Sequence, residues 1–121
     1  MANQVVWFDV PVIDLDRAVR FYSSVLGGSV HKQEFQGLKF AVLPHEEKEI
    51  SGCLTPGAEG NKPSPHGPLL YFNCQGRLDQ AVGVVESNGG KILQAKHPIG
   101  PYGFRAIVLD SEGNRIALHS M

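Results

Sequence analysis

The final strand predicted in this sequence carries two polar side chains on one face, with a small residue between them. The stretch "DSEGN" (110–114) is typical of a turn, because short polar residues and glycine tolerate turn geometry. In the strand predicted at 115–119, Arg115, Ala117 and His119 share one face, because side chains alternate along a strand. The guanidinium of Arg115 can bind a carboxylate, and His119 can accept or donate a proton near neutral pH.

Structural interpretations of both polar residues stay open. Arg115 can instead be a surface arginine beside Glu112, and His119 can be a solvent-exposed histidine near the end of the sequence. The other histidines lack the spacings His-x-His and His-x-x-x-His that favour a shared metal ion, and we predict them at the surface. These are His31, His45, His66 and His97.

A tryptophan and an aspartate share a face of the strand predicted at 4–12, "QVVWFDVPV". Trp7 can stack on a planar ligand, or it can simply fill the interior of a cleft. Asp9 is a candidate general base, with a capped or salt-bridged carboxylate as the structural alternative. Tyr71 and Asn73, on a later strand, extend this surface or satisfy the hydrogen bonds of a buried polar layer.

The stretch "HPIGPYGFRA" (97–106) combines two prolines that stiffen the chain with two glycines that allow close backbone approach. Tyr102 and Phe104 are candidates for the rim or lid of a cleft. The alternative is a tight hairpin whose aromatic rings pack on a second copy of the chain. Arg105 begins a strand and is a candidate to face the cleft.

Hydrophobic periodicity and turn residues predict the elements that position these side chains. One helix begins after the N-cap Asp14 and ends at Gly27–Gly28, and a second is predicted at 77–90. Residues 56–68, with four prolines and three glycines, form a loop. Strands are predicted at 4–12, 29–36, 38–43 and 49–55 before this loop, and at 69–74, 91–97, 104–109 and 115–119 after it.

The two halves of the sequence repeat the same order of elements. "LDRAVRFYSSVLGG" begins at Leu15 and "LDQAVGVVESNGG" begins at Leu78. Each half reads as strand, helix and three strands, which predicts two βαβββ modules at about 1–56 and 68–121, with a linker at about 57–67. Each module has one sheet face covered by its helix and one open, so that two open faces can enclose a shared cleft.

Composition narrows the class of protein. The chain has 121 residues and a formal net charge of −1, so no basic field attracts nucleic acid or anionic lipid. No apolar run reaches the roughly 20 residues of a membrane span, and "MANQVVWFDV" does not read as a signal peptide. We therefore expect a cytoplasmic protein without membrane or nucleic-acid partners, whose Cys53 and Cys74 are buried and reduced.

Three stretches resemble the vicinal oxygen chelate superfamily, which includes glyoxalase I, bleomycin-resistance proteins and extradiol dioxygenases. They are "DLDRAVRFYSSVLGG", "LDQAVGVVESNGG" and the closing "DSEGNRIALHS". The likeness is greatest to small two-module members related to lactoylglutathione lyase, of which "PIGPYGF" (98–104) and "GNRIALHS" look typical. The resemblance implies an α+β fold of two βαβββ modules forming a cupped mixed sheet, and a homodimer.

Metal-using members of this superfamily hold a divalent ion with His, Gln or Glu from the first, fourth, fifth and eighth strands. Carried over to this sequence, the four positions fall on Trp7, on the stretch "ISGCLT" (50–55), on Leu69 or Leu70, and on Ala117. None of them offers a usual ligand, so we expect no metal ligands and no cofactor. The small side chain of Ala117 leaves room for an organic ligand.

The first functional hypothesis is a small-molecule-binding protein whose cleft lacks the usual metal ligands. Its candidate ligand-binding residues are Trp7, Tyr71, Asn73, Tyr102, Phe104, Arg105, Arg115 and Ala117. The alternative is a lyase, isomerase or dioxygenase-type enzyme acting on a small carbonyl compound in the same cleft, with His119 and Asp9 as catalytic residues. A third hypothesis is an accessory subunit whose cleft is vestigial.

Overall fold

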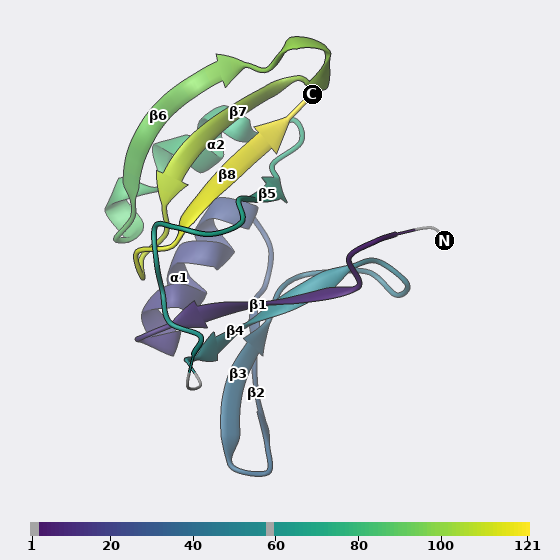
Figure 1. The fold of residues 1–121 in the computed structure, drawn as a ribbon, viewed down its shortest axis with the longest axis vertical. Helices are drawn as coiled ribbons and strands as arrows, with labels where there is room; N and C mark the ends of the chain where they lie inside the picture. The colour runs from purple at the N-terminus through teal and green to yellow at the C-terminus, as the bar shows by residue number, and fades with distance from the viewer. Residues whose placement is uncertain (1–2, 58–59) are drawn as a thin grey trace.

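The structure, a computed structural model, describes residues 3–57 and 60–121 and contains two four-stranded sheets with helices packed on one side (Figure 1). The first sheet has the strand order β1-β4-β3-β2 and the second the order β5-β8-β7-β6. The elements are β1 (Trp7–Val12), α1 (Leu15–Leu26), β2 (His31–Phe35), β3 (Leu38–Val42), β4 (Ser51–Pro56), β5 (Leu70–Asn73), α2 (Leu78–Gly83), the 3-10 turn η1 (Glu86–Asn88), β6 (Lys91–Pro98), the 3-10 turn η2 (Gly100–Tyr102), β7 (Phe104–Leu109) and β8 (Arg115–Ser120).

Both sheets are built in the same way. The first and last strands of each half are parallel neighbours, β1 with β4 and β5 with β8, and the other pairs are antiparallel. This confirms the predicted α+β fold of two βαβββ units. None of the helices in the described parts of the chain is both long and apolar enough to span a bilayer.

The first helix begins and ends where its sequence predicts. The Asp14 carboxylate accepts a hydrogen bond from the backbone N–H of Arg17 at 3.0 Å, which caps the helix. At the other end Gly27 adopts a φ of 71°, and its N–H donates to the carbonyl of Ser23. The buried face consists of Ala18, Phe21, Tyr22 and Val25.

The largest differences from the predicted boundaries occur in two elements, α2 and β1. The second helix stops at Gly83, and backbone bonds from Val84 to Ala81 and from Val85 to Val82 continue the chain in tighter turns. Glycine is a poor helix former, which explains the early end. The first strand begins at Trp7 rather than at residue 4, because its partner strand begins at Ser51, opposite Trp7.

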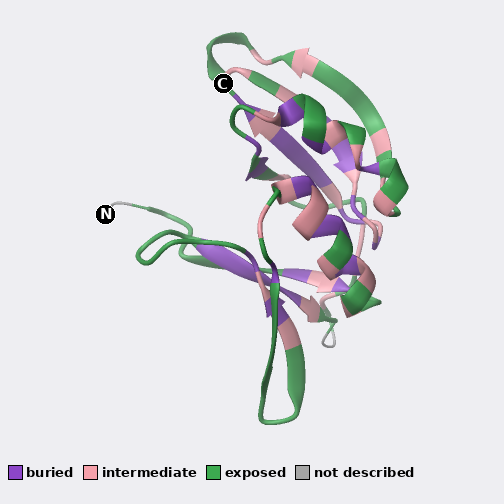
Figure 2. Ribbon diagram, turned by 180° about the vertical axis from the view of Figure 1, so that it is seen from behind, coloured by how far each residue is buried: buried purple, intermediate pink, exposed green. Residues whose placement is uncertain are grey.

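The helix-facing sides of both sheets share one hydrophobic core, and Figure 2 shows buried residues on both sheets and on the helices. Aromatic rings contact one another in this core. The ring centroids of Phe8 and Phe72 lie 5.9 Å apart, and those of Tyr22 and Phe72 lie 5.4 Å apart. Phe8 belongs to the first half and Phe72 to the second, so these contacts join the two halves. In the described part of the chain, no helix covers the opposite face of either sheet.

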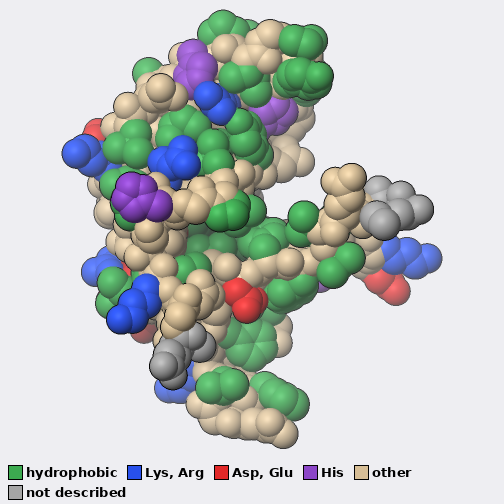
Figure 3. Space-filling view, in the orientation of Figure 1, with side chains coloured by type: hydrophobic (Ala, Val, Ile, Leu, Met, Phe, Trp, Pro, Cys, Tyr) green, Lys and Arg blue, Asp and Glu red, His purple; other side chains and the backbone are tan. Residues whose placement is uncertain are grey.

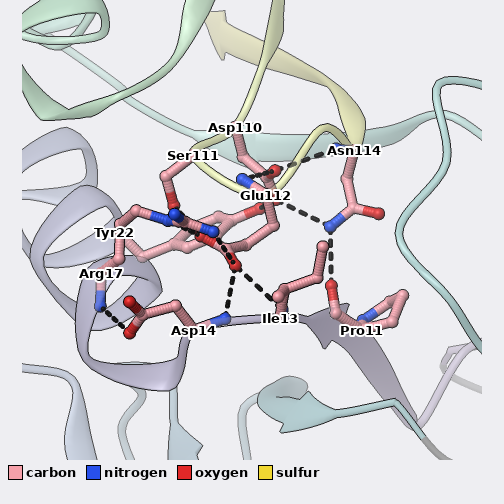
Figure 4. Close-up of polar contacts among 9 residues, drawn as sticks. All are labelled: Pro11, Ile13, Asp14, Arg17, Tyr22, Asp110, Ser111, Glu112 and Asn114. Carbon is pink, nitrogen blue, oxygen red and sulfur yellow. Dashed lines mark hydrogen bonds and ion pairs between the residues drawn. The ribbon is translucent and has the colours of Figure 1, made fainter.

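A buried carboxylate from the second half also binds the start of α1 (Figure 4). Glu112 lies in the β7–β8 turn, and its side chain is 0% exposed. Its Oε1 accepts hydrogen bonds from the backbone N–H groups of Ile13 at 2.8 Å and Asp14 at 2.7 Å. The guanidinium of Arg17 donates to both carboxylate oxygens at 2.7 and 2.9 Å, and the hydroxyl of Ser111 donates at 2.8 Å.

Two further side chains of the same turn extend this network. The hydroxyl of Tyr22, on α1, donates to Asp110 Oδ2 at 2.6 Å. The amide of Asn114 donates to Asp110 Oδ2 at 2.9 Å and to the carbonyl of Pro11, on β1, at 2.8 Å. Asp110 Oδ1 accepts from the backbone N–H groups of Glu112 and Asn114, which fixes the turn itself.

Burial alone raises the pKa of Glu112, but the hydrogen bonds from Arg17, Asp14, Ser111 and Ile13 outweigh it and lower the pKa from 4.5 to about 2. A depressed carboxyl pKa stabilises the folded protein above the unfolded-state value. That stabilisation is lost as pH falls from about 4.5 towards 2. It amounts to on the order of 3 kcal/mol.

We predict that Glu112→Gln lowers the free energy of unfolding at pH 7 by about 3 kcal/mol, because it leaves the Arg17 guanidinium without its counter-charge. The variant should also lose much of the stability change between pH 4.5 and 2. Urea titrations at several pH values measure both effects. Glu47→Gln changes an exposed carboxylate and is the control; its free energy of unfolding should match that of the wild-type protein. If the free energy of unfolding of Glu112→Gln depends on pH below 4.5 as that of the wild type does, the prediction is wrong.

Candidate functional site

A cluster of polar side chains lies on the open face of the second sheet. The strand register places Tyr71 opposite Ala117, His119 opposite Arg105, and Arg105 opposite His97. Because directly opposed residues share a face, all five point away from the helices. We call the side chains of Tyr71, His97, Arg105 and His119 the Arg105 cluster.

Hydrogen bonds hold the guanidinium of Arg105 in place. Its Nε donates to His97 Nε2 at 3.0 Å, and its Nη1 donates to the hydroxyl of Tyr71. The other ring nitrogen of His97 lies 2.8 Å from the carbonyl of Ala95. A carbonyl only accepts, so His97 Nδ1 carries the proton and Nε2 presents a lone pair to Arg105. The Arg105 Cζ lies 5.9 Å from the centroid of the Tyr71 ring.

His119 is oriented by the backbone of the β6–β7 connection. Its Nε2 lies 2.6 Å from the carbonyl of Tyr102 and therefore donates its proton there. Nδ1 has no hydrogen-bond partner among the described residues and remains an acceptor. The His119 ring meets the edge of Tyr71 at a centroid distance of 6.2 Å.

A pocket of about 420 Å³ opens beside the cluster, lined by Tyr71, Ile99, Tyr102, Arg105 and His119. Figure 3 shows histidine and basic side chains among hydrophobic ones over this half of the molecule. The η2 turn forms one wall of the pocket.

The turn that forms this wall depends on Gly103. It has a φ of 90°, and a Cβ atom there would lie 2.4 Å from the carbonyl of Ser120. Glycine is therefore required at this position.

The first sheet holds a separate polar group. Trp7 Nε1 donates to Asp9 Oδ1 at 3.2 Å, and Cys53 Sγ donates to the same oxygen at 3.2 Å. Burial, followed by the hydrogen bond to Asp9, raises the pKa of the Cys53 thiol to about 11, so the thiol stays protonated as a donor. The structure thus divides the predicted site residues between the two sheets. Neither Trp7 nor Asp9 lines the pocket of the Arg105 cluster.

Three other predicted site residues have different surroundings from those expected. Arg115 Nε donates to the carbonyl of Pro65 at 3.0 Å, and Glu112 pairs with Arg17 instead. The side chain of Asn73 accepts from the backbone N–H of Gln75 at 2.9 Å, so it caps a turn. Ala117 is 0% exposed, so the expected open space at its methyl group is filled.

Phe104 does not border the pocket with Tyr102, contrary to the expectation. It alternates with Arg105 along β7 and shares the helix-facing side with the buried Ala106. The ammonium of Lys96 lies 5.4 Å from its ring centroid, and Lys96 also pairs with Asp79 of α2 at 3.0 Å.

His97 is predicted as a surface histidine without a partner role, but the structure places it in the Arg105 cluster. The signal that could have found it is its position across a hairpin from Arg105. Register shifts between Ile92 and Gln94, and between Gln94 and His97, break the simple alternation of β6 and hide that pairing.

The side chains at the positions where the resemblance implies metal ligands do not fit a divalent ion. On the open faces Trp7 lies opposite Ser51, and Ala117 lies opposite Tyr71. The fifth-strand residue that faces Ala117 is Tyr71, whereas Leu70, one of the two residues to which the resemblance assigns the position, pairs with Ile116.

The side chains at these positions are an indole, a hydroxyl, a phenol and a methyl group. The Ser51 hydroxyl donates to the carbonyl of Leu43, and the Tyr71 hydroxyl accepts from Arg105, whose charge repels a cation. Within residues 3–57 and 60–121, no three His, Cys, Asp or Glu side chains group as a metal site.

The repeated βαβββ unit can now be compared with known proteins. The model of the Glyoxalase/Bleomycin resistance protein/Dioxygenase superfamily matches residues 4–118. The chain belongs to this superfamily. No curated protein matches this chain significantly.

Solved structures from the superfamily share the fold. A glyoxalase/bleomycin resistance protein from Albidiferax ferrireducens T118 is 19% identical, with a TM-score of 0.80 over 98% of this chain and 99% of that one. A glyoxalase/bleomycin resistance protein/dioxygenase family enzyme from Burkholderia phytofirmans PsJN is 18% identical, with a TM-score of 0.73 over 95% and 96%. A glyoxalase I mutant from Zea mays is 20% identical, with a TM-score of 0.70 over 94% of this chain and 45% of that one.

We predict that Trp7→Ala changes the free energy of unfolding by less than about 1 kcal/mol, because the side chain is 46% exposed on the open face. The adjacent Phe8→Ala should cost about 3 kcal/mol, because Phe8 packs on Phe72 in the core. Urea unfolding of both variants compares them. Equal losses would show that Trp7 belongs to the core, which would remove it as a ligand-binding candidate.

Proposed function

We propose that this member of the superfamily binds a small organic molecule without a divalent metal, in the pocket of the Arg105 cluster. One observation carries the proposal. The open-face positions at which the resemblance to metal-using members implies ligands carry Trp7, Ser51, Tyr71 and Ala117, and the phenol among them is hydrogen-bonded to an arginine.

The character of the pocket supports an organic ligand. Its volume of about 420 Å³ lies within the range of small-molecule sites. Tyr71, Tyr102 and Ile99 supply apolar surface, while Arg105 and His119 supply fixed polar groups. Mostly apolar walls with a few oriented polar groups are the usual composition of a ligand site.

We expect no stabilisation by divalent ions. Ni²⁺, Zn²⁺ or Mn²⁺ at micromolar concentration should shift the melting temperature by less than about 1 °C, because an ion that does not bind the folded state cannot stabilise it. Thermal melts of the tag-free protein with each ion, and with EDTA as the control, test this. An increase of several degrees would contradict the metal-independent proposal.

We also propose a homodimer in the cytoplasm. Cys53 and Cys74 are both buried and free, which suits a reducing compartment. The β2–β3 hairpin extends away from the rest of the molecule (Figure 1), and it carries Phe35 at 64% and Leu38 at 70% exposure. A second copy of the chain that covers these apolar side chains would remove them from water.

The double variant Phe35→Ser and Leu38→Ser tests this assembly. Wild-type protein should sediment with the mass of two chains at micromolar concentration, and the double variant as one, because the apolar contact is lost. Sedimentation velocity over a dilution series provides the measurement. Val6→Ser, which changes an exposed apolar residue away from the hairpin, is the control; a wild-type protein that is monomeric throughout would exclude the dimer.

A further inference from the structure

We propose that the pocket of the Arg105 cluster recognises the carboxylate of a small aromatic acid, with Arg105 as the residue that selects the charge. The inference depends on the proposed function, because it assumes that this pocket is the ligand site. It adds the chemical class of the ligand and the residues that distinguish that class from a neutral molecule of the same shape.

The first argument is the state of the guanidinium. An arginine has five N–H donors, and the Arg105 cluster uses one on Nε and one on Nη1. Nη2 has no partner within the parts of the chain that the structure describes. Three donors therefore remain for a ligand, enough for the paired hydrogen bonds by which guanidinium binds carboxylate.

The second argument is charge. Both groups that hold Arg105 are neutral acceptors, the lone pair of His97 and the hydroxyl of Tyr71. No aspartate or glutamate lines the pocket, and no ion pair of Arg105 occurs among the described residues. A positive charge that is oriented but not neutralised attracts an anion from solution. Arg17 shows the contrast, because Glu112 already neutralises it.

The third argument is the shape and polarity of the other walls. Tyr71 and Tyr102 present aromatic rings, and Ile99 adds an apolar surface between the cluster and the η2 turn. Aromatic rings favour stacking or edge contacts with another ring. A carboxylate attached to an aromatic body satisfies the guanidinium and these walls together.

His97 is a positioning residue in this proposal. It does not line the pocket, but its Nε2 accepts the Nε–H of Arg105 at 3.0 Å, and its Nδ1–H is fixed on the carbonyl of Ala95. Removing the ring would free the guanidinium to rotate. Glutamine at the same position keeps a side-chain acceptor, so it should preserve the orientation of Arg105.

The test compares charged and neutral ligands of one shape on the full chain. Benzoate and phenylacetate are titrated against benzamide and phenylacetamide, and binding is followed by shifts of the backbone amide NMR signals. We expect each acid to bind at least about tenfold more tightly than its amide, because the bond to the guanidinium is charge-assisted. The shifts should centre on residues 99–105 and on Tyr71.

Matched variants assign the preference to one arginine. Arg105→Gln should abolish the acid-over-amide ratio, while Arg115→Gln, on the same open face but bonded to Pro65, should keep it. His97→Ala should reduce the ratio and His97→Gln should restore it. Thermal melts confirm that each variant is folded. If Arg105→Gln is unfolded, the neutral and unbranched Arg105→Met replaces it and should likewise abolish the acid-over-amide ratio.

Three outcomes would overturn the inference: equal binding of acids and amides, no binding of either acid, or an unchanged ratio in Arg105→Gln. If the ratio is unchanged in Arg105→Gln and lost in Arg115→Gln, Arg115 selects the charge instead. If amides and acids bind in this pocket with equal affinity, the inference fails but the proposed small-molecule function stands. Divalent-ion stabilisation in the melting experiment would remove the proposed function independently of these titrations.

Discussion

The ion pair between Glu112 and Arg17 is the constraint on which the rest of the molecule depends. The two residues lie 95 positions apart and belong to different halves, yet the carboxylate is fully buried against the first turn of α1. The same β7–β8 turn binds β1 through Asn114 and α1 through Asp110. Since β8 begins directly after this turn, the network that joins the halves also fixes the register that places His119 opposite Arg105.

The fold was predictable because its signals are local. Alternation along the strands, the N-cap Asp14 and the glycine after α1 depend on neighbouring residues, and the structure agrees with them at α1 and at β7. The misjudged boundaries depend on non-local partners or on weak helix formers. β1 is shortened because β4 begins at Ser51, and α2 ends at Gly83, although an apolar face continues in the sequence.

The candidate site was predictable in part for the same reason. Strand alternation predicts Tyr71 and His119 on the open face, and the Pro- and Gly-rich stretch 97–106 predicts Tyr102 and Arg105 at the cleft. The structure places all four around one pocket. His97 could not be predicted in this way, because the register shifts in β6 interrupt the alternation of side chains along the strand. The pairing of Glu112 with Arg17 was also missed, because no sequence pattern shows which of several arginines a distant carboxylate will meet. Asp9 proved to belong to a different polar group, with Trp7 and Cys53.

The two arginines explain why one part of the protein is structural and another is suited to binding. Arg17 pairs with the carboxylate of Glu112, which accepts five hydrogen bonds in all. The two charges neutralise each other, so neither attracts a charged ligand. Arg105 meets only neutral acceptors at Nε and Nη1, which orient it without cancelling its charge. That single difference disfavours a divalent cation beside Tyr71 and favours an anion at the same point. The indole, hydroxyl, phenol and methyl group on the open faces and the oriented Arg105 therefore point the same way, because both suit an anionic ligand better than a divalent cation.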